Sequence, residues 1–275
     1  MFNPSYLIPR LARHFMPSGA TRFLLRRGWM IRPGLETRDP DAAARRYADA
    51  LAEEGIGLEG KRVLVFGYGG AFAVGCALLE LGAAHVTLCE KDAPTDDRRN
   101  LELLPRYPHY LRAAGERVLP NEAMLSLQQG DIRQLAAQKA IQPVDVVLSN
   151  SVYEHLDDVE GITAALAALT RPDGVQLHYV DLRDHFFRYP FQMLFYSKAV
   201  WYGWLNPGSN HNRYRYPDYA RVFDRYFARA EISVLGREVE AFRAAKARIR
   251  PEFLSGDEQV DAITLIKVLA REPRA

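Results

Sequence analysis

Short apolar runs alternate with longer amphipathic stretches along most of this chain. The short runs are rich in Val, Leu and Ile and bounded by turn residues, so they predict strands, expected at 63–66, 85–89, 125–128, 144–148, 175–180, 232–235 and 263–269. The amphipathic stretches predict helices, expected at 40–54, 71–81, 132–139, 158–170 and 221–228. The alternation predicts an α/β fold with a doubly wound, mainly parallel seven-stranded sheet.

The first strand runs into a glycine-rich turn, which predicts a nucleotide-type cofactor site. Gly67, Gly69 and Gly70 let the backbone turn tightly and approach a ligand closely. Glu90 follows the second strand, where a carboxylate can accept hydrogen bonds from both hydroxyls of a ribose. A dinucleotide site needs a third glycine where this chain has Phe72, so the spacing disfavours an NAD(P)-dependent oxidoreductase.

The turn from Gly67 to Ala71 resembles the G-x-G-x-G turn of class I (Rossmann-like) S-adenosylmethionine-dependent methyltransferases of the small-molecule type. The segment 144–181 resembles the second half of the same domain, with polar residues after each strand. The resemblance implies S-adenosyl-L-methionine as cofactor, with contacts from Gly67, Tyr68, Gly69, Gly70, Glu90, Lys91, Asp131, Ile132, Ser149 and Asn150. Ala71 takes the place of the third glycine in this turn. Two further positions depart from the family pattern, Val65 and Asp173. They leave open a degenerate fold that binds cofactor or a partner without catalysis.

Methyl transfer needs an aligned acceptor atom, and it needs a base only where that atom carries a proton to be lost. His155 is the first base candidate, because it follows the fourth strand and imidazole titrates near neutral pH. His185 and Tyr153 are the further catalytic candidates. An oxygen or nitrogen acceptor is expected rather than carbon. We expect no metal site, because the loosely spaced set of His178, Asp181 and His185 has no convincing ligand spacing.

Two segments flank or interrupt the expected methyltransferase domain, which spans residues 39–275. Residues 1–38 form a basic, helical leader, which is interpreted as a second lid, as a segment in transient contact with a membrane surface through residues 1–34, or as a solvated arm. Residues 185–219 hold 12 of the 30 aromatic residues and predict an acceptor-binding insertion. An insertion rich in aromatic residues suits a small-molecule or lipid-like acceptor.

Composition narrows the class of protein. The net charge of +2 does not favour nucleic acid as a partner, and 48% hydrophobic residues suffice for a full core. The two cysteines, Cys76 and Cys89, fall in expected buried elements, so they predict no disulfide and a reducing, cytoplasmic location. No apolar run reaches the roughly 18–20 residues that a membrane span requires. The oligomeric state stays open.

Overall fold

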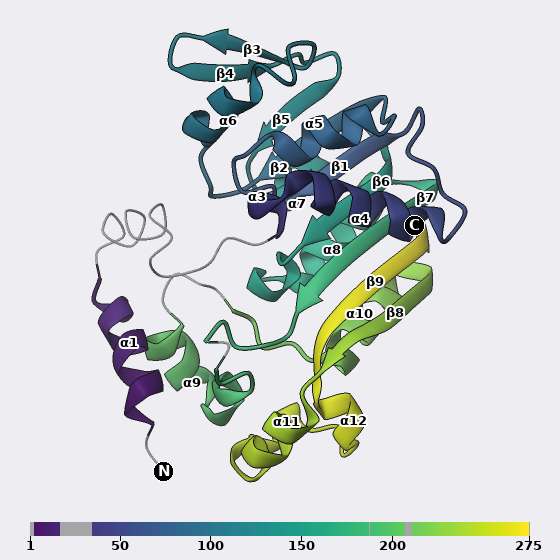
Figure 1. Ribbon diagram of the computed structural model, residues 1–275. Helices are drawn as coiled ribbons and strands as arrows, with labels where there is room; N and C mark the ends of the chain where they lie inside the picture. The colour runs from purple at the N-terminus through teal and green to yellow at the C-terminus, as the bar shows by residue number, and fades with distance from the viewer. Residues whose placement is uncertain (1–2, 17–34, 187, 207–210, 275) are drawn as a thin grey trace.

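A computed structural model of the chain describes residues 3–16, 35–186, 188–206 and 211–274 (Figure 1). Its main sheet has seven strands in the order β5-β2-β1-β6-β7-β9-β8. The strands are β1 (Arg62–Phe66), β2 (His85–Glu90), β5 (Leu125–Gln129), β6 (Val144–Asn150), β7 (Thr170–Asp181), β8 (Phe227–Arg237) and β9 (Ile263–Pro273). β9 pairs antiparallel with both β7 and β8, and the other pairs are parallel. The predicted Rossmann-like sheet is therefore confirmed.

Helices cover both faces of the sheet because successive side chains of each central strand point to opposite faces. In β1, Val63 and Val65 join one core cluster with residues of α4 and α5, whereas Leu64 and Phe66 join a second cluster with residues of α8 and α10. The helices are α4 (Pro40–Ala52), α5 (Ala73–Glu80), α6 (Asp97–Leu103), α7 (Ile132–Ala137), α8 (Val159–Leu169) and α10 (Tyr216–Tyr226). This doubly covered sheet holds its strand ends rigidly in place.

Two parts of the expected element map were wrong. Helix α10 begins at Tyr216 and not at 221, because Pro217 occupies its first turn and the Asp218 carboxylate accepts a hydrogen bond from the Arg215 amide at 2.9 Å. It ends at Tyr226, so Phe227 already belongs to β8. An additional hairpin formed by β3 (Leu111–Ala114) and β4 (Arg117–Pro120) was not predicted at all.

A third, smaller core lies beyond the carboxyl end of β7. It unites α1 (Pro4–His14) with the segment after β7 and with α11 (Val239–Ala245), through Tyr6, Leu7, Trp201, Phe242 and other buried residues. The segment after β7 contains η2 (Gln192–Phe195), α9 (Lys198–Val200) and η3 (Trp201–Leu205). Shorter elements complete the chain: α3 (Leu35–Arg38), η1 (Tyr153–His155), η4 (Lys246–Arg248), η5 (Pro251–Phe253) and α12 (Glu258–Asp261). Figure 1 shows α1 and α9 side by side, away from the helices that cover the sheet.

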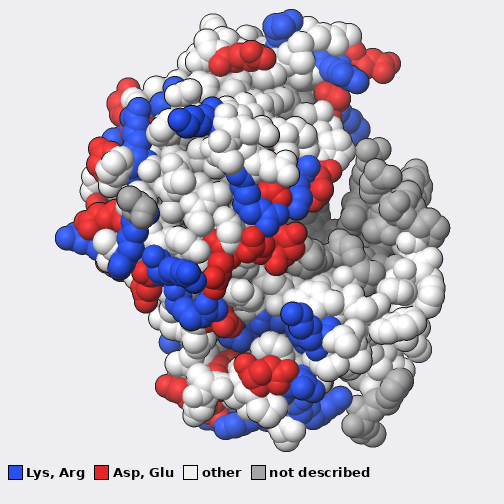
Figure 2. All heavy atoms as spheres, turned by 180° about the vertical axis from the view of Figure 1, so that it is seen from behind, with Lys and Arg blue, Asp and Glu red and all other residues white. Residues whose placement is uncertain are grey.

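The surface carries charged residues of both signs. On the face shown in Figure 2, basic and acidic residues are interspersed over much of the surface. None of the helices among the described residues is long and apolar enough to cross a membrane. Most of the basic leader, residues 17–34, lies outside the described residues.

Candidate active site

The glycine turn stands at the carboxyl end of β1, and its three glycines all have positive φ, a conformation that side chains disfavour. A Cβ atom on Gly67 would lie 2.4 Å from Val152 Cγ2, and one on Gly70 would lie 2.3 Å from the Pro94 carbonyl oxygen. A Cβ atom on Gly69 would meet nothing within 4 Å. Gly67 and Gly70 are therefore required by packing, while Gly69 faces open space at the strand ends.

Glu90 holds its carboxylate against this turn. Its Oε2 accepts a hydrogen bond from the Gly69 amide at 3.1 Å. Its Oε1 accepts from the amides of Lys91 at 2.9 Å and Asp92 at 3.2 Å. These bonds fix the carboxylate while leaving lone pairs of both oxygens for hydroxyl donors. Glu90 thus sits where the sequence analysis placed a ribose-binding acid.

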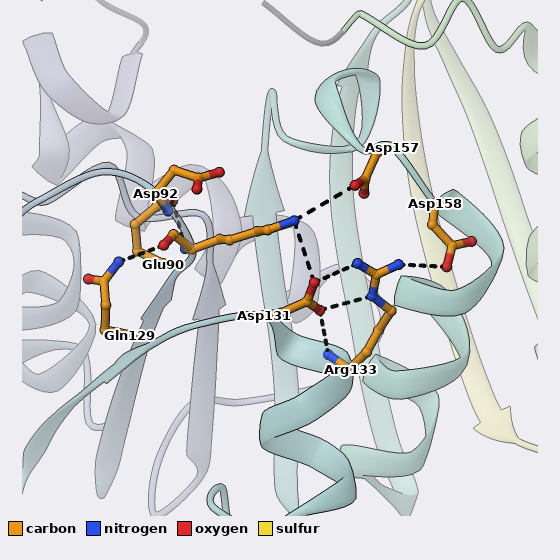
Figure 3. Close-up of polar contacts among 8 residues, drawn as sticks. Glu90, Asp92, Gln129, Asp131, Arg133, Asp157 and Asp158 are labelled. Atoms are coloured by element: carbon orange, nitrogen blue, oxygen red, sulfur yellow. Dashed lines mark hydrogen bonds and ion pairs between the residues drawn. The ribbon is translucent and has the colours of Figure 1, made fainter. Parts of the chain in front are cut away.

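Asp131 and Lys91 belong to a charged network beside Glu90 (Figure 3). Asp131 caps α7, accepting from the Arg133 amide at 3.0 Å, and its carboxylate also binds the Arg133 guanidinium in bidentate fashion. Lys91 Nζ lies 3.4 Å from Asp131 Oδ2 and 3.7 Å from Asp157 Oδ2. The hydrogen bonds from Arg133 hold the pKa of the Asp131 carboxyl below its usual range. Asp131 therefore stays ionised and available as an acceptor at neutral pH.

A cavity of about 150 Å³ opens between these residues. Gly67, Glu90, Lys91, Asp131 and Ile132 line one part of it. Val152, His155 and Leu156, from the loop after β6, line another. A larger cavity of about 450 Å³ lies at the β3–β4 hairpin, which contributes no strand to the main sheet. We take the smaller cavity as the site, because ligands of parallel sheets bind at the carboxyl ends of the strands.

Three predicted site residues have side chains that turn away from this cavity. The Ser149 hydroxyl hydrogen-bonds His178 Nδ1 at 2.7 Å inside the core, and the Tyr68 side chain is buried in the first core cluster. Tyr153 was predicted to be catalytic, which is wrong: its side chain is 0% exposed, and its ring lies 4.6 Å from that of His178 and 5.4 Å from that of Phe223. Ser149 and Tyr68 retain only their backbone for a ligand.

Asn150 ends β6 and faces residues that the sequence analysis missed. Its Oδ1 accepts a hydrogen bond from Arg46 Nη2 at 2.7 Å, and Arg46 Cζ stands 3.8 Å from the centroid of the Tyr179 ring. The Arg46 Nε is buried without a hydrogen-bond partner. Burial also raises the pKa of nearby Glu36 to about 7. The sequence analysis did not identify Arg46 and Glu36, because both residues lie in the helical region before β1, where no motif spacing marks them.

His155 and His185 come together, as two of the three predicted catalytic residues. Their ring centroids lie 4.7 Å apart, and the ring of His211 lies 4.8 Å from that of His185. Burial, followed by the charge of His155, lowers the pKa of His185 to about 4, and burial also lowers the pKa of His211 well below its usual range. These two imidazoles are therefore neutral at pH 7. His211 was not among the predicted catalytic residues, because it lies 56 positions after His155 in the sequence.

Helix α1 packs beside this histidine cluster. Arg10 forms an ion pair with Asp184, which is 0% exposed, and donates to the Leu205 carbonyl at 2.8 Å. The Tyr6 hydroxyl also donates to Asp184. Much of the aromatic insertion packs into the third core, and its Arg213 donates to the Tyr196 carbonyl at 2.7 Å. Residues 207–210 of the insertion lie outside the described residues.

Comparison with known proteins agrees with this geometry. Residues 101–177 match a family model described as a methyltransferase domain. A protein of Galdieria sulphuraria assigned as a sarcosine dimethylglycine methyltransferase is 14% identical with a TM-score of 0.50, over 84% of this chain and 85% of that one. Phosphoethanolamine N-methyltransferase 2 of Haemonchus contortus, solved with phosphomonomethylethanolamine and S-adenosylhomocysteine, is 13% identical with a TM-score of 0.50, over 84% of this chain and 53% of that one. No curated protein matches the sequence.

The sheet order, the glycine turn with its acidic partner and the matched domain point to one family. The solved structures share the fold at low identity, and the family match adds the activity class. Residues 101–177 thus match a methyltransferase domain model, and the chain has the Rossmann-like fold that these solved methyltransferases share.

Proposed function

We propose that the protein transfers a methyl group from S-adenosylmethionine to an oxygen or nitrogen atom of a small-molecule or lipid-like acceptor. One observation carries the proposal: the Glu90 carboxylate lies 3.1 Å from the amide of Gly69, the glycine of the turn that faces open space. Backbone amides, open space and a fixed carboxylate at one strand edge suit the ribose and methionine parts of this cofactor. The residues present therefore fit the cofactor.

Three groups of residues would hold the cofactor. Glu90 would accept hydrogen bonds from the ribose hydroxyls, and Asp131 with Ile132 would flank the adenine. Arg46, with its buried and unpaired Nε, would bind the carboxylate of the methionine moiety. Glu36 supplies a carboxyl near Arg46, whereas Val65 lacks the acid that the family often has. When bound, the cofactor supplies an activated methyl group.

The acceptor would enter on the side of His155 and His185. Catalysis there consists of alignment and exclusion of water, which α1 and the segment after β7 provide by packing beside the histidines. A neutral imidazole could take a proton from an oxygen or nitrogen acceptor. The two solved structures with this fold are named for small acceptors, which supports a small acceptor here.

The setting of the reaction follows from the surface and the cysteines. Cys76 and Cys89 are buried and unpaired, which supports a reducing, cytoplasmic compartment. Phe15 and Trp204 are exposed by 72% and 52%, with ring centroids 6.5 Å apart. Exposed aromatic side chains next to the basic leader support transient contact with a membrane surface, from which a lipid-like acceptor would come.

The test is calorimetric binding of S-adenosylmethionine, S-adenosylhomocysteine and NADH. We expect the first two to bind and NADH not to bind. Glu90→Ala should weaken cofactor binding by about 1–3 kcal/mol, roughly 5–150-fold, because the ribose loses its charged acceptor. Glu102→Ala is the matched control, since Glu102 is exposed on α6 and pairs only with exposed Arg98.

The outcomes separate the competing functions. Binding of NADH alone would indicate hydride chemistry. Cofactor binding without transfer of a labelled methyl group to any acceptor in a broad screen would indicate a non-catalytic binding protein. Equal affinity of Glu90→Ala and the unmodified chain would remove Glu90 from the site.

A further inference from the structure

Four side chains with metal-ligand chemistry gather beside the cofactor cavity. Glu154 and His155 come from η1, and His185 follows β7. One ligand atom from each of these three residues lies within 4.8 Å of the others, a spacing that a single ion can bridge. The fourth residue, His211, has its ring 4.8 Å from that of His185 and 5.5 Å from that of His155.

Two of the four residues are buried with their polar atoms unsatisfied. Glu154 is 1% exposed, and neither of its carboxylate oxygens makes a hydrogen bond of normal geometry. His211 is 3% exposed, and neither of its ring nitrogens makes one either. Native proteins rarely leave such groups without a partner, and a bound ion is one of the few explanations. The backbone of His211 is fixed, because its carbonyl accepts from Trp201 Nε1 at 3.0 Å and from Asn206 Nδ2 at 3.1 Å.

The charged side chains around these four residues are compatible with a bound cation. Arg10 and Arg183 are the nearby guanidinium groups, and each is ion-paired with an aspartate, Asp184 and Asp181 respectively. Glu154 brings a further carboxyl group, which loses its proton when it binds a metal ion. An added divalent cation would therefore meet a carboxyl group and imidazoles, and neither Arg10 nor Arg183 is an unpaired guanidinium.

We propose that Glu154, His155 and His185 bind one first-row divalent transition-metal ion, with His211 beside its open coordination position. Imidazole nitrogen together with carboxylate oxygen suits Zn²⁺, Fe²⁺ or Mn²⁺ rather than Ca²⁺, which prefers oxygen ligands alone. Three protein ligands leave a position for water or substrate, as catalytic metal sites do. The site differs from the set of His178, Asp181 and His185 considered in the sequence, because His178 is bonded to Ser149 and Gln176 in the core.

The metal would act on the acceptor, and this consequence rests on the proposed function. His155 lines the cofactor cavity, so a ligand of the open position would lie beside the methyl group to be transferred. A metal-bound hydroxyl of the acceptor loses its proton to solvent water at a lower pH than a free one. Its oxygen then forms the new C–O bond while the C–S bond of the sulfonium breaks and S-adenosylhomocysteine leaves. The acceptor class is thus a hydroxyl compound.

The metal site is tested by binding, independently of methyl transfer. The full chain is stripped with a chelator and titrated with Zn²⁺ by calorimetry and with Co²⁺ by visible absorption. We expect one ion per chain and the d–d bands of a Co²⁺ ion bound by nitrogen and oxygen. His185→Ala and Glu154→Gln should each lower metal affinity by more than about 100-fold, since loss of a direct ligand exceeds the 10–100-fold typical for supporting residues.

The controls make each outcome decisive. His109→Ala removes an exposed histidine of the chain far from η1 in sequence, and it should bind Zn²⁺ as the unmodified chain does. Thermal melts confirm that each variant is folded, and the isosteric Glu154→Gln change keeps the side-chain volume. Absence of stoichiometric binding to the unmodified chain, or unchanged affinity in both ligand variants, overturns the proposal. If the chain binds S-adenosylmethionine but no metal ion, the metal site is overturned and the proposed function stands. If it binds the metal ion but not S-adenosylmethionine, the proposed function is overturned and the metal site stands.

Discussion

The glycines of the turn divide into two that packing requires and one, Gly69, that faces open space. Gly67 and Gly70 would collide with Val152 and Pro94 if they carried a side chain, so their substitution would damage the fold before it affected binding. Gly69 has the same backbone conformation and no neighbour within 4 Å. Gly60 shares both properties, with φ of 70° against 69°, but stands in the loop before β1.

Gly69→Ala should therefore separate binding from stability. Both Gly69→Ala and Gly60→Ala should cost about 1–2 kcal/mol of unfolding free energy, because alanine disfavours positive φ. Only Gly69→Ala should weaken binding of S-adenosylmethionine, because its methyl group enters the space for the ligand. Urea unfolding and calorimetry measure the two quantities. Equal cofactor affinity in the two variants would contradict the assignment of the turn.

At the scale of residues, the sequence predicted those features that depend on neighbouring positions in the chain. Gly69 and Glu90 follow from a turn and a strand end, and the structure joins them by a hydrogen bond from the Gly69 amide to the Glu90 carboxylate. Ser149 was misplaced because β6 extends to Asn150, so Ser149 is still a sheet residue facing the core. The Tyr153 side chain enters the core from a 3₁₀ turn. The direction of a side chain in such a turn follows no periodic sequence pattern, so the sequence could not predict it.

At the scale of elements, helix α1 depends on contacts with a distant part of the chain. Its Arg10 reaches Asp184 and the Leu205 carbonyl, and its Tyr6 is buried in the third core. Sequence periodicity indicated an amphipathic leader, but it could not show which surface the leader covers, since that depends on contacts about 175 residues apart in sequence. The β3–β4 hairpin escaped prediction because its strands are short and carry little apolar alternation.

Arg10→Met should release α1 while the main sheet stays folded. Removing one partner of a buried ion pair costs about 3–5 kcal/mol. The buried Asp184 carboxylate would keep only neutral donors among the described residues, the Tyr6 hydroxyl and the Phe186 amide. Hydrogen exchange of residues 4–14 should become faster, with strands β1 and β6 unchanged. Arg98→Met, which breaks an exposed pair with Glu102, is the control. Equal protection of α1 in both variants would show that the ion pair does not hold the helix.

At the scale of the whole molecule, two buried titratable groups have opposite effects on how the unfolding free energy depends on pH. Burial lowers the pKa of His178 to about 3, so the unfolded chain binds a proton there that the folded chain does not, and stability falls as the pH decreases from about 6.5. Burial raises the pKa of Glu36 to about 7, so this group stabilises the folded chain as the pH decreases over the same range. Over this range of pH the contributions of His178 and Glu36 to the unfolding free energy therefore offset each other.

The variant His178→Asn isolates the contribution of His178 to the pH dependence of the unfolding free energy. Between about pH 6 and pH 4.5 the unfolding free energy of the unmodified chain should fall more steeply than that of the variant, by about 1.4 kcal/mol per pH unit, the value for one proton. Urea unfolding across this range measures the difference. His109→Asn, at an exposed histidine, should leave the slope unchanged. Parallel slopes for His178→Asn and the unmodified chain would mean that His178 titrates normally in the folded protein.

The third core joins α1 to residues far along the chain, and this has a consequence for biosynthesis. Tyr6 and Leu7 leave the ribosome long before their partners Phe242, Ile249 and Ala262. The glycine turn and Glu90, by contrast, lie within residues 67–90 and need strands only as far as β6 for their neighbours. A nascent chain could therefore form the sheet edge with the glycine turn well before the third core. The apolar face of α1 would stay unpaired until residue 262 has been synthesised.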